Sequence, residues 1–202
     1  MCECAAVDGC RPGPVGETGP VTRLFVVLSG LPASGKTTLG RRLAPELGLP
    51  LLDKDDILSP LLAALEVADP VTRHRLSRGA DTVLHRLAAG SAGAVISSFW
   101  RWPQLSEASG TPTDWLESLT DSVVVEVFCQ CPPQLAAKRF SERGRHPGHG
   151  DATKNTIDLI EQFTAWNSLA PLRTGRAVIT VNSSQLIDAR SVAASVRELS
   201  RL

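Results

Sequence analysis

The sequence predicts a three-layer α/β fold in which helices cover both faces of a five-stranded parallel sheet. Two observations carry this prediction. Five short apolar segments alternate with segments of helical periodicity, and such alternation produces parallel strands joined by right-handed crossovers. The first apolar segment, 24–29, runs directly into a glycine-rich match to G-x-x-x-x-G-K-[ST]. With 202 residues, of which 43% are apolar, the chain is long enough to form one domain with a sizeable core.

The glycine-rich segment predicts a loop that binds a nucleoside triphosphate. Leu39, Leu43 and Leu47 recur every fourth residue after it, which indicates one face of a helix, so the motif lies between a strand and a helix as it must. In such loops the backbone N–H groups converge on a phosphate, and the helix dipole adds to the attraction. We expect an exposed Lys36 to reach the β- and γ-phosphates and the Thr37 hydroxyl to ligate Mg²⁺. The residues predicted to bind the nucleotide are Gly30, Leu31, Pro32, Ala33, Ser34, Gly35, Lys36, Thr37 and Thr38.

Charge and cysteine usage narrow the class of protein. Lys plus Arg equals Asp plus Glu at 21 each, so no overall field favours nucleic acid or a membrane surface. No apolar run approaches the ~18 residues of a membrane span, and we find no signal-peptide pattern. The five cysteines suit free thiols of a cytoplasmic protein better than a disulfide scaffold or half of a metal site. Residues 1 to about 21, rich in Gly and Pro, are predicted to be a flexible tail ahead of a domain over 22–202.

An acidic segment follows the second predicted strand. Residues 49–52 are apolar and run straight into Asp53-Lys54-Asp55-Asp56. Ligands of open α/β sheets bind beyond the carboxyl ends of the strands, so we expect Asp53 or Asp55 to face the phosphates. The alternative is a solvated turn in which Asp56 caps the next helix. Both can hold, because the cap needs only one carboxylate.

The middle of the chain predicts a long helix and a third strand. Residues 70 to about 89 have the pattern of an amphipathic helix, with His74 and His85 expected on its exposed face. Its apolar positions are Val71, Leu76, Val83, Leu84 and Leu87. A strand over 94–99 then leads into the aromatic segment 99–103. These aromatic side chains either line a substrate pocket or complete the hydrophobic core, since aromatic side chains occur in both places.

The next segment predicts a basic lid. A short helix over 114–119 and a fourth strand over 123–128 precede a helix opened by Pro132 or Pro133. Arg139 and Arg143 are four residues apart, which predicts that they share one face of this helix. A Gly/Pro/His-rich continuation reaches Gly150, and a hinged basic segment of this kind can close over a triphosphate. The alternative is an ordinary solvated helix end that favours positive charge.

The remaining elements complete the predicted sheet. A helix over 153–169 carries an apolar stripe of Ile157, Ile160, Phe163 and Trp166. A fifth strand over 177–181 is followed by Asn182-Ser183-Ser184, where a nucleotide base would be contacted, and a helix over 188–202 closes the chain.

With these features in order, the chain resembles the P-loop kinases of small molecules. Among them it is most similar to AAA-type ATP-binding proteins related to chloramphenicol phosphotransferase, zeta toxins and polynucleotide 5′-kinases. The resemblance spans about residues 23–200 and is strongest over Gly30 to Thr38. It implies a P-loop NTPase fold of the nucleotide-kinase type with a short Arg-bearing lid.

The resemblance also implies roles for individual residues. Asp55 matches the carboxylate that takes the proton of the attacking hydroxyl, and Asp53 matches an acid that holds Mg²⁺ through water. Arg139 and Arg143 match lid arginines. The third strand ends in Ser97-Ser98, where relatives often carry an acid, and this departure places more weight on Asp53 as the metal partner.

The sequence therefore predicts an ATP-dependent kinase that phosphorylates a hydroxyl of a small molecule, with ATP and Mg²⁺ as cofactors. The predicted catalytic residues are Asp55, Lys36, Arg139 and Arg143, and Thr37 and Asp53 are the predicted metal-binding residues. One alternative is a polynucleotide or nucleoside kinase, although a net charge of zero argues against a nucleic-acid substrate. Another is an ATPase or nucleotide-binding switch that lacks a phosphoryl acceptor. We expect no membrane partner and a monomer or a dimer, and the sequence does not identify the acceptor.

Overall fold

The structure is a computed structural model of the whole chain. It describes residues 22–65, 67, 69–102, 104–105, 110–119, 121–144, 149, 155–175 and 177–201. The predicted tail and most of the Gly/Pro/His-rich continuation lie outside the described residues, so both expectations stay predictions.

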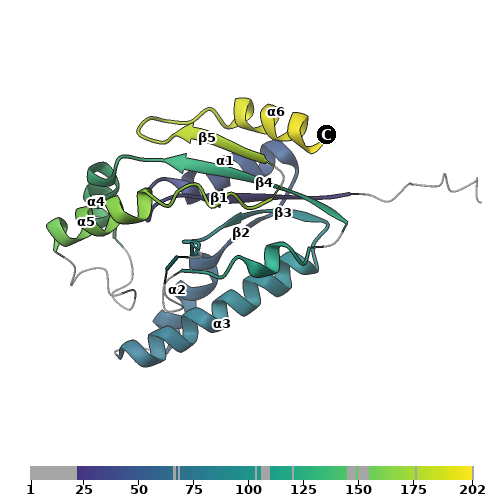
Figure 1. Cartoon of the computed structure of the whole chain (residues 1–202). Coiled ribbons are helices and arrows are strands. Elements are labelled where there is room, and N and C mark those ends of the chain that lie inside the picture. Colours follow the sequence, from purple (N-terminus) through teal and green to yellow (C-terminus); the bar gives the residue numbers. More distant parts are fainter. Residues whose placement is uncertain are drawn as a thin grey trace, which may run out of the picture.

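Five parallel strands form the sheet, in the order β2-β3-β1-β4-β5 (Figure 1). The strands are β1 (Arg23–Ser29), β2 (Leu51–Asp53), β3 (Gly93–Ser97), β4 (Ser122–Gln130) and β5 (Ala177–Asn182). The predicted parallel α/β sheet is confirmed, because every pair of neighbouring strands is parallel. Because β1 lies between β3 and β4, its residues from Phe25 to Leu28 are fully buried. The carboxyl ends of all five strands meet at one edge of the sheet.

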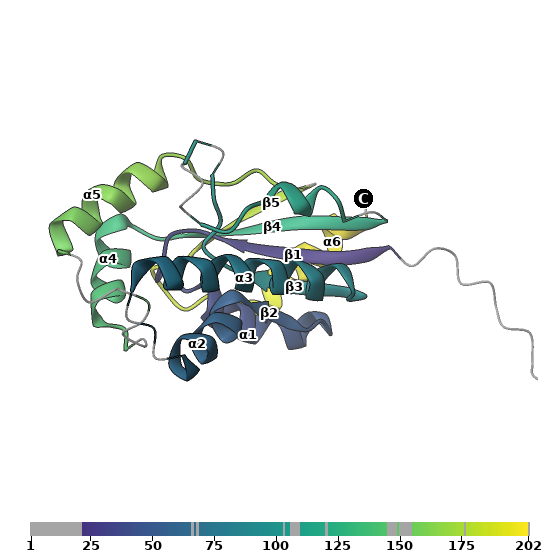
Figure 2. The ribbon, with the colours of Figure 1, turned by 90° about the horizontal axis from the view of Figure 1, so that it is seen from below.

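Helices cover both faces of the sheet (Figures 1 and 2). The α-helices are α1 (Lys36–Leu47), α2 (Lys54–Ala64), α3 (Pro70–Ala89), α4 (Pro133–Glu142), α5 (Thr156–Asn167) and α6 (Ala189–Ser200). On one face α1 and α6 pack against β1, β3 and β4, and on the other face α3 packs against β1 and β3. The α4 and α5 helices pack against each other and against Leu31, so they extend the molecule past the carboxyl ends of the strands.

The leucine stripe predicted for the first helix is confirmed, whereas the apolar faces predicted for two later helices are confirmed only in part. Leu39 and Leu43 are buried in the core. In α3, Val71, Val83 and Leu87 are exposed, whereas the helix buries Ala80, Asp81, Leu84 and Ala88. The small alanine side chains allow α3 to approach the sheet closely, and hydrophobic size alone does not reveal that choice. In α5, three of the four predicted stripe residues pack as expected: Phe163 is buried, and Ile160 and Trp166 pack against the same cluster. Ile157 is exposed and Leu159 is buried instead, because this helix packs on α4 rather than on the sheet.

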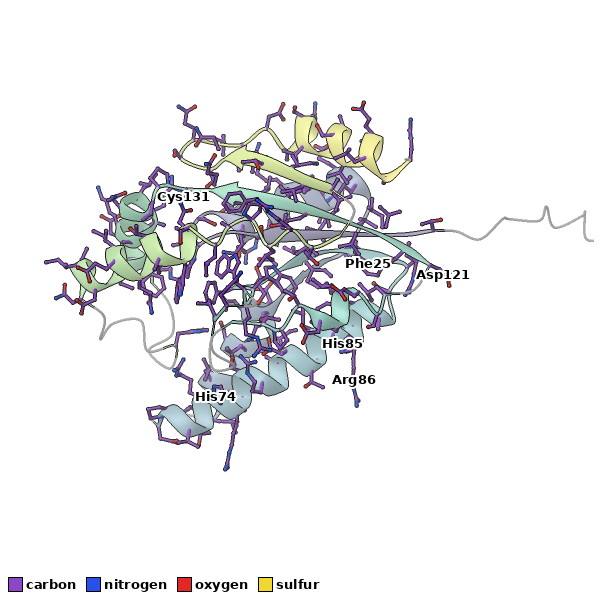
Figure 3. All side chains as sticks on the ribbon, in the orientation of Figure 1. Phe25, His74, His85, Arg86, Asp121 and Cys131 are labelled. Atoms are coloured by element: carbon purple, nitrogen blue, oxygen red, sulfur yellow. The ribbon has the colours of Figure 1, made fainter. Side chains whose placement is uncertain are left out.

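Several element boundaries also differ from the expectation. The second strand begins at Leu51 and continues to Asp53, and the third ends at Ser97. The predicted helix over 114–119 is a 3₁₀ helix, η1 (Asp114–Leu116). His85 was expected on the exposed face of its helix, but its ring stacks on Trp115 with centroids 4.8 Å apart; Figure 3 shows its position along α3 relative to His74.

A buried carboxylate ties the start of the glycine-rich loop to the chain that follows α5. Glu126, in β4, is fully buried and accepts a hydrogen bond from Ser29 Oγ at 2.5 Å. The same carboxylate accepts from the backbone N–H groups of Leu172 at 2.9 Å and Thr174 at 3.3 Å. Ser29 directly precedes Gly30, so Glu126 fixes the point at which the loop leaves the sheet.

Two of the five cysteines are described; both are free, as expected, and both are buried. Burial raises the pKa of Cys129 to about 12 and also raises that of Cys131. Both thiols are therefore unreactive at neutral pH. Among the described residues we find no helix that is long and apolar enough to span a lipid bilayer.

Candidate active site

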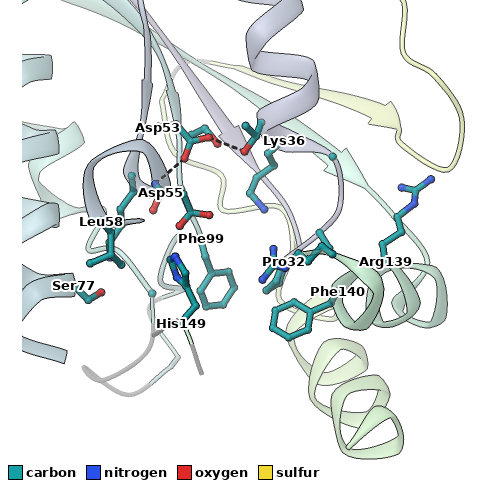
Figure 4. Close-up of a pocket in the computed structure, with 18 of the residues that line it drawn as sticks. Pro32, Lys36, Asp53, Asp55, Leu58, Ser77, Phe99, Arg139, Phe140 and His149 are labelled. Carbon is teal, nitrogen blue, oxygen red and sulfur yellow. Dashed lines mark hydrogen bonds between the residues drawn. The ribbon is translucent and has the colours of Figure 1, made fainter. Parts of the chain in front are cut away.

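A cavity of about 530 Å³ opens at the carboxyl ends of the strands, where the predicted site residues gather (Figure 4). Three groups of residues line it. The phosphate-loop side consists of residues 32–38, except Ser34, together with Asp53. The α3 side comprises Lys54, Asp55, Leu58, Arg73, His74, Ser77, Arg78, Ser97, Ser98, Phe99 and Gly110. The α4–α5 side comprises Arg139, Phe140, Arg143, Phe163 and Trp166.

The glycine-rich loop has the shape that a phosphate requires. Gly30 adopts a φ of 131°, and a Cβ there would lie 2.6 Å from the carbonyl oxygen of Cys129. Gly35 adopts a left-handed conformation with a φ of 96° and precedes α1 without capping it through a side chain. By contrast, an Asp or Asn side chain caps α2, α3, α5 and α6. The first N–H groups of α1 are therefore left for a ligand, and an anion is the natural one.

Lys36 is buried, contrary to the exposure that the sequence predicts. Its side chain is folded over its own loop, where Nζ donates to the carbonyl oxygens of Gly30 at 3.0 Å and Leu31 at 2.7 Å. Burial lowers the pKa of Lys36 to about 8, because desolvation disfavours the charged ammonium. The buried Ser34 hydroxyl has no hydrogen-bond partner among the described residues. A nearly desolvated ammonium beside an unsatisfied hydroxyl is an environment that a bound phosphate completes.

Thr37 and Asp53 form a direct pair on the phosphate-loop side. The Thr37 hydroxyl donates to Asp53 Oδ2 at 2.7 Å, and Asp53 Oδ1 accepts from the backbone N–H of Asp55 at 2.9 Å. Asp53 is therefore the N-cap of α2, a role that the sequence suggested for Asp56. Burial raises the pKa of Asp53, although these two hydrogen bonds partly offset the rise. Hydroxyl and carboxylate oxygens are ligands that Mg²⁺ prefers, so this pair suits a magnesium ion.

Asp55 lies in the first turn of α2 and lines the cavity. Figure 4 shows its side chain pointing into the cavity, toward the side that holds Lys36. Burial lowers the pKa of Lys36, and the negative charge of Asp55 partly offsets this by raising it. The two groups are therefore close enough to interact electrostatically. Asp56 faces elsewhere: it is exposed, and Oδ1 lies 3.6 Å from the Arg41 guanidinium.

The two predicted lid arginines do not share a helix face. The α4 helix ends at Glu142, and Arg143 has an extended backbone with a ψ of 130°, so the four-residue spacing no longer aligns the two side chains. Arg139 donates to the carbonyl oxygens of Ser183 at 2.8 Å and Ser184 at 3.1 Å, and Figure 4 shows it pointing away from Lys36. Arg143 lies with its guanidinium 4.1 Å from the ring centroid of Phe140, and its positive charge lowers the pKa of Lys36. Arg143 is therefore close enough for its charge to act on Lys36, whereas Arg139 borders the phosphate loop on the side of Ser183 and Ser184.

A second cavity adjoins the first on the far side of Arg139. It has a volume of about 360 Å³ and lies between the phosphate loop, α1 and the segment that follows β5. Ser183 and Ser184, which the sequence predicts to contact a nucleotide base, line it, whereas Asn182 does not.

The aromatic segment after β3 divides between the two roles that the sequence left open. Trp100 and Trp102 are buried, and Trp100 Nε1 donates to the carbonyl oxygen of Leu28 at 2.8 Å, so they belong to the core. Phe99 lines the cavity and contacts Trp166 of α5, with ring centroids 4.7 Å apart.

Sequence reasoning missed a polar cluster behind the α3 side. Lys54 Nζ lies 2.6 Å from Asp81 Oδ1 and donates to Thr111 Oγ1 at 3.3 Å. Arg78 contacts the other oxygen of Asp81 at 3.4 Å, and Ser98 Oγ lies 2.6 Å from Thr111 Oγ1. These residues come from four separate segments. The only signal in the sequence was a lysine within the acidic segment after β2, and nothing in the pattern connected it to Asp81.

His149 was predicted only as part of the lid segment, yet it lines the same cavity. Its ring is nearly buried, and Nε2 lies 3.0 Å from Ser59 Oγ.

A phosphate loop at the carboxyl edge of a parallel sheet, followed by a hydroxyl–carboxylate pair, defines a P-loop protein with a nucleotide-kinase-like fold. Comparison with known families agrees: the family model described as "AAA domain" matches residues 25–166. The chain belongs to this family, and the predicted resemblance to P-loop kinases is confirmed.

Solved structures share the fold over most of the chain. A protein from Chloroflexus aurantiacus, described as a candidate kinase, is 26% identical with a TM-score of 0.73, and the match covers 88% of this chain and 98% of that one. A shikimate kinase from Bacteroides thetaiotaomicron is 19% identical with a TM-score of 0.56, covering 89% of this chain and 99% of that one. A curated shikimate kinase from Paracidovorax citrulli is 53% identical over 36 residues, which are 18% of this chain and 20% of that enzyme.

Proposed function

We propose that this protein is an ATP-dependent kinase that transfers the γ-phosphoryl group to a hydroxyl of a small molecule. The observation that carries the proposal is the convergence of four groups on one cavity: the Lys36 ammonium, the Thr37–Asp53 pair and the Asp55 carboxylate. The first three fit a magnesium–triphosphate complex, and Asp55 faces it from the opposite side. An ATPase would use such a carboxylate to position water, so detection of a phosphorylated acceptor distinguishes the two functions.

The nucleotide would lie along residues 30–38. The N–H groups at the start of α1 would hold the phosphates, and Thr37 and Asp53 would hold Mg²⁺. Bound Mg-ATP would supply the γ-phosphoryl group and neutralise part of its charge. Lys36 would leave the carbonyl oxygens of Gly30 and Leu31 and donate to phosphate oxygens instead. The cavity beside Ser183 and Ser184 has room for the base.

On the acceptor side, Asp55 would orient the hydroxyl and accept its proton as the oxygen forms its bond to phosphorus. Arg143 and Lys36 would stabilise the charge that develops on the transferred group. Arg139 would act from the nucleotide side, because it holds the segment that borders the second cavity.

The substitution Asp55→Asn tests the proposal, because it keeps the size of the side chain and removes its basicity. Phosphoryl transfer should fall by roughly 10²- to 10⁴-fold while Mg-ATP still binds. Transfer is measured with labelled ATP against a panel of antibiotics, sugars, hydroxy acids, nucleosides and oligonucleotides, and binding is measured by thermal stabilisation.

Asp56→Asn is the matched control, since that carboxylate is the exposed neighbour in the same helical turn and lies near the surface guanidinium of Arg41. Transfer by Asp55→Asn at the wild-type rate would remove Asp55 from the reaction. ATP hydrolysis without any phosphorylated acceptor would favour the ATPase alternative.

A further inference from the structure

Lys54 belongs to the acidic segment after β2 and has no role in the proposed reaction. Its side chain is nevertheless buried. It is 8% exposed, although it lies between Asp53 and Asp55 in the sequence. Its side chain turns toward α3, where the ammonium contacts Asp81 and Thr111. The ammonium lies 2.6 Å from Asp81 Oδ1, so the neighbouring carboxylate offsets the cost of burying this charge. A buried charge with a specific partner in a cavity wall is a candidate for a functional role.

The charges around Lys54 do not balance. Lys54 and Arg78 both line the cavity, whereas Asp81 does not, so two cations share one carboxylate that lies behind them. Among the described residues of the cavity wall the imbalance continues, because six cationic side chains line it against the two carboxylates Asp53 and Asp55. Mg-ATP brings a net charge of about −2, which compensates only part of this excess.

One buried donor of the same cluster is also unsatisfied. Arg78 Nε has no hydrogen-bond partner among the described residues, although Arg78 donates through another nitrogen to the carbonyl oxygen of Gly110 at 2.7 Å. An unsatisfied buried donor is costly, and in a cavity wall it indicates a group that arrives with a ligand.

We propose that Lys54 and Arg78 bind an anionic group of the phosphoryl acceptor, so that the acceptor is an anionic hydroxy compound: a hydroxy acid or a phosphorylated alcohol. This inference rests on the proposed kinase function. Lys54 is adjacent in sequence to Asp55, so an anion held at Lys54 places the remainder of a small molecule beside the carboxylate that receives the hydroxyl proton. Asp81 and Thr111 act through Lys54 and are positioning residues.

Binding is tested on the full chain saturated with Mg-AMP-PNP, which fills the phosphate loop so that small anions cannot occupy it. The probes are matched by carbon skeleton: glycerate and gluconate carry a carboxylate, glycerol 3-phosphate and glucose 6-phosphate carry a phosphate, and glycerol and glucose are neutral. We expect an anionic probe to raise Tm where its neutral counterpart does not, and the responding pair distinguishes carboxylate from phosphate. Equal responses to charged and neutral probes, or no response to any anion, would overturn the inference.

Substitutions at Lys54 locate the binding. Lys54→Met should weaken the effective anionic probe by at least about tenfold, the scale of hydrogen bonds to a charged group, and raise KM for that acceptor more than KM for ATP. Lys54→Arg should restore binding in part, and Lys138→Met, on the exposed face of α4, should change nothing. If Lys54→Met folds poorly because Asp81 loses a partner, Lys54→Met combined with Asp81→Asn removes both charges and is expected to show the same loss. Unchanged acceptor affinity in either variant contradicts the inference.

The same experiment distinguishes the two proposals. Failure of Mg-AMP-PNP to stabilise the wild-type protein contradicts the kinase function itself. Stabilisation by Mg-AMP-PNP without any discrimination between charged and neutral probes contradicts the anionic acceptor alone.

Discussion

The phosphate-loop side and the α3 side of the cavity are built in different ways. Nearly all of the phosphate-loop side comes from one continuous segment, residues 32–38, whose shape depends on Gly30, Gly35 and the start of α1. The α3 side is assembled from α2, α3 and the two segments around 97–99 and 110–111, which meet only in the folded chain. The proposed triphosphate site is thus encoded locally, whereas the proposed acceptor site depends on pairings between distant residues. Substitutions on the two sides should therefore fail in different ways.

The largest effect is expected at Lys36 on the phosphate-loop side. Lys36→Met should lower kcat/KM by about 10³-fold or more, because it removes the cation closest to the transferred group in a water-poor site. The nucleotide-free protein should keep its Tm, since a buried methionine avoids the desolvation that lowers the pKa of Lys36. Activity assays and thermal unfolding of this variant, with Lys138→Met as control, check both statements. A parallel loss of stability would mean that Lys36 mainly supports the loop.

A smaller effect is expected at Arg143, and it distinguishes the two arginines of the α4–α5 side. Arg143→Ala should lower kcat by roughly 10²-fold with little change in KM for ATP, the result of losing one electrostatic group near the transferred charge. Arg139→Ala should instead raise KM for ATP, because it releases the segment that holds Ser183 and Ser184. Steady-state kinetics with Arg190→Ala, a surface arginine beside Glu46, provide the reference. Identical kinetic signatures in the first two variants would contradict this division.

Asp53→Asn should raise the Mg²⁺ concentration required for activity by about tenfold, which is the lower end of the loss in metal affinity caused by such changes. Asparagine caps helices about as well as aspartate, so the α2 N-cap should survive and Tm should change little. Titration of Mg²⁺ at fixed ATP and acceptor measures the shift. An unchanged magnesium dependence would leave Asp53 as a cap and nothing more.

The smallest expected effect is the uptake of a proton by Lys36 when the nucleotide binds. With a pKa of about 8 in the nucleotide-free protein, Lys36 is mostly neutral at about pH 9, and bound phosphates should raise its pKa by favouring the ammonium. Nucleotide binding at about pH 9 should therefore take up close to one proton, and binding at about pH 7 only a small fraction of one. Calorimetry in two buffers of different ionisation enthalpy measures this uptake, which should vanish in Lys36→Met. Uptake that persists in the variant would belong to another group.

The sequence predicted most of the fold because its signals are local. The α3 helix has the boundaries that its proline and glycine signals indicated, and the strand–loop–helix of the phosphate site follows from a motif whose geometry is set by neighbouring residues. The failures arise where a partner is distant. The burial of Lys36 depends on its hydrogen bond to the carbonyl oxygen of Leu31 in the loop. The different orientations of Arg139 and Arg143 depend on where α4 ends. The pairing of Lys54 with Asp81 joins residues 27 positions apart that no periodicity connects.

The ring contact between Phe99 and Trp166 gives the molecule an optical reporter. The chain has four tryptophans and no tyrosine, so its near-ultraviolet emission comes from indole alone. Trp166 lies between Phe99, at the end of the sheet, and Phe163, within α5, with ring centroids 4.7 and 5.6 Å away. A shift of α5 relative to the sheet changes the surroundings of this indole, whereas Trp100 and Trp102 stay in the core. Comparing emission spectra of the wild-type protein and Trp166→Phe during nucleotide titration therefore isolates the movement of one helix without attaching a dye.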